Sequence, residues 1–312
     1  MNVMNLKALL FSRKRRGFVL VSVMMLGVLL ISCATAFTWF VRQQVRTVGS
    51  ERANLTARSL AHVLVNSAMN LLTEISSHYE YDSPTQKWYQ PFAVPIEDIG
   101  IMTVQITPLD DKIPIRNLFL PDGNTLRGEL EDPLQKMWET LRHRELEQLV
   151  LDFLDRNTRP RVGSVERENF INRPPYDMSE FLLLSRDIPT ELLHGSGGVK
   201  GIEDYCTIYS DGRINLNVAP VHVMELLPGL DTGGLAERIA QVRTSEPLQS
   251  MQDVEKIPGA SAKISSRLTN IVSFKSRYFH VRIDTFNDSG SGITFNIIFD
   301  RTTKQIVRWE ES

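Results

Sequence analysis

The chain has 312 residues, with 35 lysines and arginines against 37 aspartates and glutamates, a net charge of −2 and 42% hydrophobic residues. A multi-span membrane protein would be more apolar, a disordered chain more charged, and a dedicated nucleic-acid binder more basic, so these averages exclude all three classes. The length is sufficient for two domains, each with its own core.

The apolar residues are concentrated near the N-terminus. Residues 18–41 contain no charged side chain. As a helix at about 1.5 Å per residue this run is roughly 36 Å long, enough to cross a hydrocarbon core of about 30 Å. The basic residues that precede it, with no acidic residue among them, are Lys7, Arg13, Lys14, Arg15 and Arg16. The positive-inside rule therefore predicts a single-pass inner-membrane protein with a cytoplasmic N-terminus and a periplasmic body.

The basic leader and the apolar run meet at Gly17 and Phe18. A conventional signal peptide has an apolar region of about 7–15 residues and a small-residue cleavage site; residues 33–36 are small, but this run is longer. The boundary instead resembles the type IV prepilin signal, which a membrane peptidase cuts after the glycine. The resemblance implies a leader at 1–17 and a mature chain that begins at an N-methylated Phe18. An ordinary signal anchor is the alternative.

The fifth residue after the predicted cut is Ser22, where pilins and most pseudopilins have a glutamate. A lone carboxylate in the bilayer is costly, and in that family it pairs with the positive N-terminus of a neighbouring subunit. A subunit with Ser22 cannot form this pair. The position therefore indicates a pilin-like subunit with a special place in its assembly.

Helical spacing continues beyond the membrane run. Apolar residues recur three and four positions apart as far as Ile75, and no proline follows before Pro84. We expect one helix over about 18–77, whose second half packs on a globular domain. The prolines and aromatic residues of 84–95 predict an irregular connection.

Strand-like runs lie on both sides of a long central segment. They occupy 100–107, 278–286, 293–299 and 305–309, with turn residues at 287–292 and 300–304. Phe279, Val281 and Ile283 alternate with polar residues, which predicts an antiparallel meander with one covered face. Helix and meander together give an α+β fold, in which 42–125 and 273–312 form a pilin-like domain.

The central segment, 126–272, is predicted to be an inserted all-α domain. Apolar residues follow helical spacing over 134–154, and 178–184 begins another helix. Two Pro-Gly pairs, Pro228-Gly229 and Pro258-Gly259, are each followed by an apolar helical pattern. They indicate paired helix-hairpin-helix, or SAM-like, units.

Helix-hairpin-helix units often bind DNA phosphates, so their charge is informative. Residues 221–272 contain five basic and six acidic residues. A phosphate-binding face normally has clustered excess positive charge. We therefore expect a packing module and no nucleic-acid partner.

The segments beside these hairpins carry the most specific resemblance. Residues 208–220, IYSDGRINLNVAP, are similar to the "G-x-INLNTAP" sequence of the general secretion pathway protein K (GspK) family, the large minor pseudopilins of type II secretion systems. Residues 151–157 with Gly163 and Glu166 resemble the family's "DWIDxD…GxE" stretch, and Pro175-Tyr176 its "PY…EL" continuation. The resemblance covers essentially the whole chain.

The resemblance implies a function in protein export. Members of this family form a complex with the I and J minor pseudopilins at the tip of the periplasmic pseudopilus, the fibre that drives export through the secretin. Further expected partners are other pseudopilins, the inner-membrane assembly platform and the prepilin peptidase. A minor pilin of a type IV pilus or competence fibre is the first alternative. A membrane-anchored DNA-binding protein is the second.

The family resemblance also implies a structural calcium ion in the helical domain. Its candidate ligands here are Asp155, Asn157 and Glu166, which supply the hard oxygen atoms that calcium binds at about 2.3–2.6 Å. Asn157 stands where the family pattern has aspartate, which removes one charge. Without the resemblance, the same residues read as a solvated helix end.

An enzymatic function has little support. The sequence lacks the G-x-S-x-G, H-E-x-x-H and P-loop motifs, and its six histidines are scattered without metal-ligand spacing. Cys33 lies in the membrane run and Cys206 in the outer domain, so we expect no intramolecular disulfide. We predict a non-enzymatic protein with no cofactor other than calcium.

Overall fold

The computed structural model describes residues 5–96, 100–286 and 292–312, with side chains from Phe18 onward. It divides into two compact units, residues 1–59 and 60–312. The turn predicted at 287–292 lies, except for Gly292, outside the described residues, as do residues 1–4 of the predicted leader.

The N-terminal helix α1 spans Asn5–His78 without a proline, which confirms the expected continuous helix. Within the described part of the chain it is the one helix long and apolar enough to cross a membrane. Its apolar residues from Phe18 to Phe40 are exposed in the protein alone, as a lipid-facing segment requires.

Five strands form one sheet in the order β1-β2-β7-β8-β9, and every neighbouring pair is antiparallel. Their bounds are Phe92–Ile96 (β1), Gly100–Pro108 (β2), Tyr278–Phe286 (β7), Thr294–Asp300 (β8) and Gln305–Glu311 (β9). The four predicted strands are confirmed. The expected irregular connection over 84–95 was partly wrong, because β1 begins there after a 3-10 helix at Lys87–Tyr89 (η1). Pro95 is tolerated because β1 is an edge strand.

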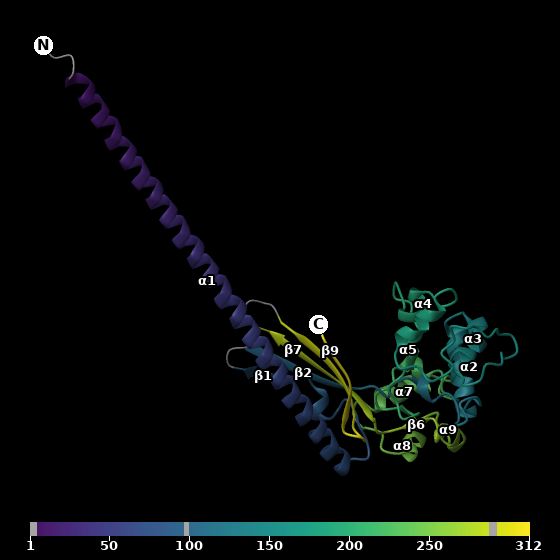
Figure 1. The fold of residues 1–312 in the computed structure, drawn as a ribbon. Coiled ribbons are helices and arrows are strands. Elements are labelled where there is room, and N and C mark those ends of the chain that lie inside the picture. Colours follow the sequence, from purple (N-terminus) through teal and green to yellow (C-terminus); the bar gives the residue numbers. More distant parts are fainter. Residues whose placement is uncertain (1–4, 97–99, 287–291) are drawn as a thin grey trace. The chain divides into compact units, whose positions relative to one another are not determined.

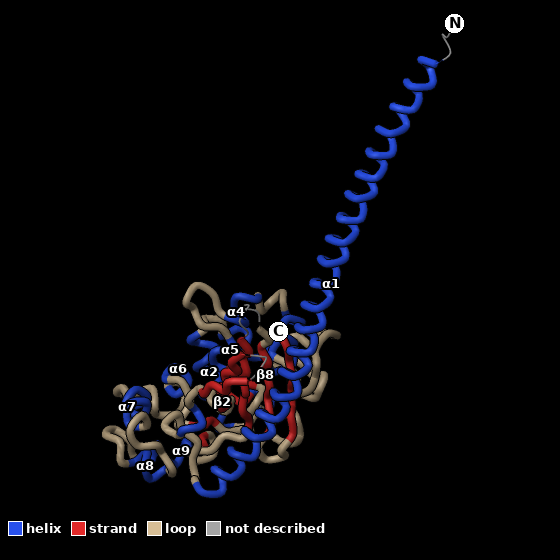
Figure 2. Tube along the Cα trace, turned by 90° about the vertical axis from the view of Figure 1, so that its left-hand side faces the viewer, coloured by secondary structure: helices blue, strands red, loops and turns tan. Residues whose placement is uncertain are grey.

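Residues 60–78 of α1 cover one face of this sheet (Figures 1 and 2). Their buried face is Ala61, Val65, Ala68 and Leu72, spaced four, three and four residues apart. On the sheet side Phe279, Val281 and Ile283 are fully buried, as their alternation predicted. His62 of α1 stacks on Trp309 of β9 with ring centroids 4.1 Å apart.

The remaining helices come from one long insertion between β2 and β7. These strands pair as a hairpin as far as Pro108 and Phe279, and residues 109–277 take the place of its turn. Figure 1 shows the helices of this insertion gathered beyond the ends of the strands. They are α2 (Gly128–Thr140), α3 (Glu147–Leu154), α4 (Thr190–His194), α5 (Ile202–Tyr205), α6 (Val221–Met224), α7 (Leu235–Val242), α8 (Met251–Glu255) and α9 (Ala262–Leu268). The 3-10 helices are η2 (Ile115–Asn117), η3 (Arg144–Leu146) and η4 (Met178–Leu184).

Two short parallel ladders join distant parts of the insertion. Ile113–Pro114 (β3) pairs with Cys206–Thr207 (β4), and Ile214–Asn215 (β5) pairs with Val272–Ser273 (β6). β3 lies within the predicted 42–125 segment yet pairs with a strand of the insertion. The domain boundaries at 126 and 272 stay predictions.

The insertion has its own hydrophobic core, built from short helices. Phe153 is fully buried and packs on Phe170 and Phe181 with centroid distances of 5.7 and 5.8 Å. The prediction of a single helix over 134–154 was wrong, because this segment contains the end of α2 and the whole of α3. The chain turns at Arg142, whose φ of +62° ends helical geometry, and the predicted helix at 178–184 is a 3-10 helix.

The two Pro-Gly hairpins pack against each other. Gly229 and Gly259 have φ values of +85° and +95°, which favour glycine, and a Cβ at Gly229 would lie 2.9 Å from Cγ1 of Ile264. Arg238 bridges the hairpins by donating from Nε to the Pro258 carbonyl at 2.7 Å. The repeat is therefore a mutual packing unit.

Candidate functional site

The predicted processing site lies within α1. The helix continues through Gly17, and Phe18 is 75% exposed. Ser22 Oγ donates a hydrogen bond to the Phe18 carbonyl at 2.9 Å, so its hydroxyl is satisfied inside the helix. Cleavage after Gly17 and methylation of Phe18 stay predictions.

The polar side chains of the apolar run are also satisfied locally. Ser32, Thr35 and Thr38 donate to the carbonyl four residues earlier, at 2.8, 3.0 and 2.7 Å. Hydrocarbon offers no other partner to such hydroxyls. The segment is thus compatible with a single-pass membrane anchor.

A group of buried oxygen atoms lies where α3 ends. Asp152 and Asp155, three residues apart, flank the Arg161 side chain: Arg161 Nη2 donates to Asp155 Oδ2 at 3.0 Å, and its backbone N–H lies 3.0 Å from Asp152 Oδ2. Asn172 Nδ2 donates to Glu166 Oε1 at 3.1 Å, and the Asn172 N–H donates to the Phe153 carbonyl. We call Asp152, Asp155, Glu166 and Asn172 the oxygen cluster.

Several atoms of the oxygen cluster lack a partner. Within the described residues, Asp155 Oδ1, Glu166 Oε2 and Asn172 Oδ1 are buried without a hydrogen-bond partner. The same holds for Ser164 Oγ on the adjoining loop and for Arg161 Nε. Each such group normally costs about 1–3 kcal/mol when it is left unsatisfied. Asn172 also has a φ of +47°, which asparagine tolerates better than most residues. These oxygens are therefore the acceptors of the cluster that no described protein group uses.

The charge of the cluster is negative. Burial raises the pKa of Asp155, Arg161 opposes that effect, and the nearby carboxylates of Asp152 and Glu166 add to it. Asp152 and Asp155 thus share the Arg161 guanidinium, and Glu166 adds a further negative charge nearby.

The donor set fits a hard cation that also binds neutral oxygens. Among the described residues, no three His, Cys, Asp or Glu side chains could hold a metal ion by themselves. Calcium accepts amide oxygens and water beside carboxylates. The unpartnered oxygens of Asp155, Glu166 and Asn172 are of these types.

Of the three predicted ligands, Asp155 and Glu166 lie near enough to interact electrostatically, and Asn157 has other partners. Asn157 Oδ1 accepts the Arg159 N–H at 2.8 Å, and Asn157 Nδ2 donates to Asn124 Oδ1 at 3.2 Å. Sequence reasoning missed Asp152 and Asn172. The helical spacing of Asp152 and Asp155 was an available signal, whereas no local pattern marks Asn172.

A second polar group connects the insertion to the sheet. Asp82, in the connection after α1, accepts two hydrogen bonds of 2.8 Å from Arg301 and one of 2.7 Å from the Ser276 N–H. Asp110 accepts backbone N–H groups from Asp211 at 3.2 Å and from Arg277 at 2.9 Å. We call Asp82, Asp110, Asn215, Asn217, Ser276 and Arg301 the joint.

The two asparagines of the joint belong to the INLN segment. Asn215 donates to Ser276 Oγ at 2.8 Å and accepts the Asn217 N–H at 2.9 Å. Asn217 in turn bonds both the N–H and the carbonyl of Leu248, at 2.9 and 2.8 Å. The INLN segment therefore links the insertion to the segment that precedes β7. Burial raises the pKa of the neighbouring Asp110 carboxyl group to about 7.

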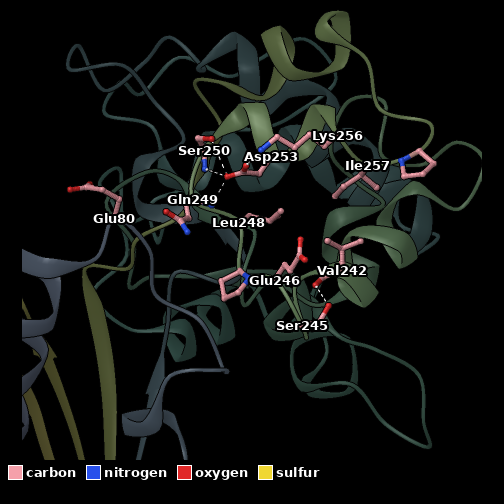
Figure 3. Close-up of a pocket in the computed structure, with 12 residues that line it drawn as sticks. Glu80, Val242, Ser245, Glu246, Leu248, Gln249, Ser250, Asp253, Lys256 and Ile257 are labelled. Atoms are coloured by element: carbon pink, nitrogen blue, oxygen red, sulfur yellow. Dashed lines mark hydrogen bonds and ion pairs between the residues drawn. The ribbon is translucent and has the colours of Figure 1, made fainter.

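A cavity of about 910 Å³ lies beside the second hairpin and is lined by α8, the end of α7 and the loop between them (Figure 3). Figure 3 shows Asp253 turned toward Ser250, whose N–H and hydroxyl both donate to it at 3.1 Å. Lys256 donates to the same carboxylate at 2.7 Å. Because Ser250 and Lys256 already bond Asp253, these polar groups do not indicate a ligand site. We interpret the cavity as a space left where the hairpins pack.

Comparison with known proteins supports the predicted fold through a solved structure. No protein-family model matches the sequence, and no curated protein matches it. Among solved structures, the chain is similar to a chain in the crystal structure of the GspK-GspI-GspJ complex from the enterotoxigenic Escherichia coli type 2 secretion system. The TM-score is 0.55 at 14% identity, over 82% of this chain and 99% of that chain. The likeness shows the α+β pilin-like fold with a long N-terminal helix, as the sequence predicted.

Proposed function

We propose that this chain is a minor pseudopilin of a type II secretion system, anchored in the inner membrane by residues 18–41. The observation that carries the proposal is the fold, in which a long helical insertion replaces one hairpin turn of a pilin-like sheet. A chain from a complex of such pseudopilins has a similar fold over almost its whole length. The sequence resemblance and the apolar helix support the same reading.

The proposal extends to a place at the tip of the fibre, in a complex with I and J minor pseudopilins. Ser22 supplies no carboxylate to pair with a subunit above it, and its hydroxyl is already bonded to Phe18. The bulk of residues 109–277 would also clash inside a tightly wound fibre. A subunit at the end has neither difficulty.

Co-purification tests this assignment. The full chain is co-expressed in detergent-soluble form with tagged I and J pseudopilins encoded by the same genome, and retention of all three is expected. Parallel co-expression with minor pilins of a type IV pilus provides the contrast. Capture by those pilins, without capture by I and J, would favour the pilus or competence-fibre alternative.

Processing of the leader is a separate proposal with its own test. When the full chain is expressed with a prepilin peptidase, the intact mass is expected to correspond to a chain that begins at a methylated Phe18. Gly17→Asp is expected to leave the leader attached. A mass that keeps residues 1–17 in both proteins would support the ordinary signal anchor.

We also propose that a structural calcium ion binds the oxygen cluster through Asp155, Glu166 and Asn172. The ion would supply positive charge and satisfy buried oxygens that now lack partners. Asn157, which the sequence also predicts as a ligand, lies outside this proposed set, and a pair of variants distinguishes the two asparagines. In calcium titration of the chelator-treated full chain, Asn172→Ala is expected to weaken binding about tenfold or more. Asn157→Ala, whose amide already has partners, is expected to leave binding nearly unchanged.

A further inference from the structure

The outer end of the predicted membrane segment carries three large side chains on one side of the helix. Trp39, Arg42 and Arg46 are exposed and are spaced three and four residues apart, so they share one face of α1. Figure 1 shows α1 continuing without a break through this region. We call these three residues the interface stripe. Because all three lie within residues 1–59, the stripe belongs to a single compact unit.

The guanidinium groups of the interface stripe lack counter-charges in the described part of the chain. Neither the Arg42 nor the Arg46 side chain has an ion pair or a hydrogen bond there. The one acid in the sequence of residues 1–59 is Glu51, five residues beyond Arg46, whereas neighbours on a helix surface are three or four residues apart. Residues 42–59 contain four arginines against this one acid. The stripe therefore stays positively charged after every acid of its unit is counted.

The position of the stripe along the helix matches the depth at which lipid phosphates lie. At about 1.5 Å per residue, Arg42 and Arg46 lie roughly 2 and 8 Å beyond Val41, the last residue of the apolar run. The headgroup layer of one leaflet is about 5–8 Å deep. Tryptophan favours the boundary between that layer and the acyl chains, and the long arginine side chain extends its charge toward water. Arg52, roughly 17 Å beyond Val41, lies outside the layer.

We propose that the interface stripe binds an anionic phospholipid in the periplasmic leaflet of the inner membrane. Arg42 and Arg46 donate hydrogen bonds to the lipid phosphate, and the Trp39 ring lies against the upper part of the acyl chains. A lipid with a net negative charge is favoured over a zwitterionic one, because each guanidinium adds attraction to a charged headgroup. The inference rests on the proposed membrane anchor and deepens it, since it names the lipid class at the outer end of the span.

Quenching of tryptophan fluorescence by brominated lipids tests the proposal with the full chain. The protein is reconstituted into vesicles of phosphatidylcholine and phosphatidylglycerol in equal amounts, with bromine on the acyl chains of one lipid or of the other. Of the four tryptophans, Trp39 is the one within the apolar run, so its quenching reports the lipids beside it. Brominated phosphatidylglycerol is expected to quench more strongly, corresponding to an enrichment of about fivefold or more.

Matched variants locate the contact. Arg42→Gln combined with Arg46→Gln is expected to abolish the preference for phosphatidylglycerol. Arg52→Gln removes the same charge beyond the headgroup layer and is expected to preserve the preference. Arg42→Lys combined with Arg46→Lys is expected to retain most of it, because both charges remain. All three arginines are exposed, and circular dichroism is expected to show the same helix content in every variant.

Equal quenching by the two brominated lipids, or a preference that survives in the double glutamine variant, would overturn the lipid contact alone. Quenching by neither lipid would contradict the membrane anchor and the lipid contact together. Co-purification of the same variant with I and J pseudopilins supplies a further contrast. If the double glutamine variant loses these partners while its lipid preference is unchanged, the two arginines bind carboxylates of a protein, and the proposal is wrong.

Discussion

The oxygen cluster and the joint are both buried, acidic and rich in side-chain oxygens, yet they differ in one respect. In the joint, Asp82 is matched by Arg301 and a backbone N–H, and no buried side-chain atom of its described residues lacks a partner. In the oxygen cluster, Asp155, Glu166 and Asn172 each keep one oxygen that no described residue hydrogen-bonds. A complete network supports the fold by itself. An incomplete one leaves acceptors for a further group, and its negative charge suits the calcium ion proposed above.

Breaking the joint is expected to have the largest effect. Asp82→Asn leaves the buried Arg301 guanidinium without its carboxylate, and the free energy of unfolding of the globular unit is expected to fall by about 3–5 kcal/mol. Urea unfolding of the full chain in detergent, followed by tryptophan fluorescence, measures it. Arg282→Met, in the more exposed pair with Asp284, is the control and is expected to cause no resolvable change. Equal behaviour of the two variants would show that the joint contributes little.

Removing the carboxylates of the oxygen cluster is expected to abolish a calcium effect of intermediate size. Calcium at a hundred times its dissociation constant should raise the free energy of unfolding of the natural chain by about 2.7 kcal/mol. In Asp155→Asn combined with Glu166→Gln, this increase is expected to disappear. Asp132→Asn, a change at an exposed acid of α2, should preserve it. A stability that is independent of calcium in all proteins would contradict the proposed site.

The asparagines of the joint allow a subtler test. Asn217→Asp keeps the shape of the side chain but replaces the amide donor that bonds the Leu248 carbonyl. The buried mismatch is expected to cost about 2 kcal/mol in the same urea assay. Asn157→Asp is the matched substitution near the oxygen cluster. Because Asn157 is only half-buried and bonds Arg159 and Asn124, this change is expected to cause no comparable loss of stability in calcium-free protein.

Over a single pH unit, the pH dependence of the joint is expected to be the smallest effect. Burial raises the pKa of Asp110 to about 7, and nearby Asp211 adds to the shift. The folded protein therefore holds a proton that the unfolded chain has released between about pH 4 and 7. Stability from this group is present at low pH and declines across that window as the pH rises, by up to about 1.4 kcal/mol per unit. Comparison of urea midpoints for the natural chain and Asp110→Asn measures it; identical slopes would refute the assignment.

Local periodicity predicted much of the fold and less of the polar clusters. The spacing of Ala61, Val65 and Leu72 and the alternation in β7 depend on neighbours along the chain, so both were visible in the sequence. The β1 strand was missed because Pro95 argues against a strand, and its edge position is a tertiary fact.

The cluster residues depend on contacts between distant segments. Asp155 and Glu166 lie close enough in sequence to be proposed together. Asn172 belongs to the oxygen cluster in a left-handed backbone conformation, which no local sequence pattern marks. The resemblance drew attention to Asn215. Its role rests on Ser276, which is far along the chain, so no local pattern could have revealed it.

The pairing of Pro108 with Phe279 also bears on how such a protein diversifies. Because the first and last residues of the insertion leave adjacent strands side by side, its length adds little strain to the sheet. The closure entropy of a loop rises by only about 0.6 kcal/mol for each doubling of its length. The sheet and α1 can thus stay constant while the insertion, residues 109–277, is lengthened, shortened or replaced. Changes within the inserted body then leave the pairing of β2 with β7 undisturbed.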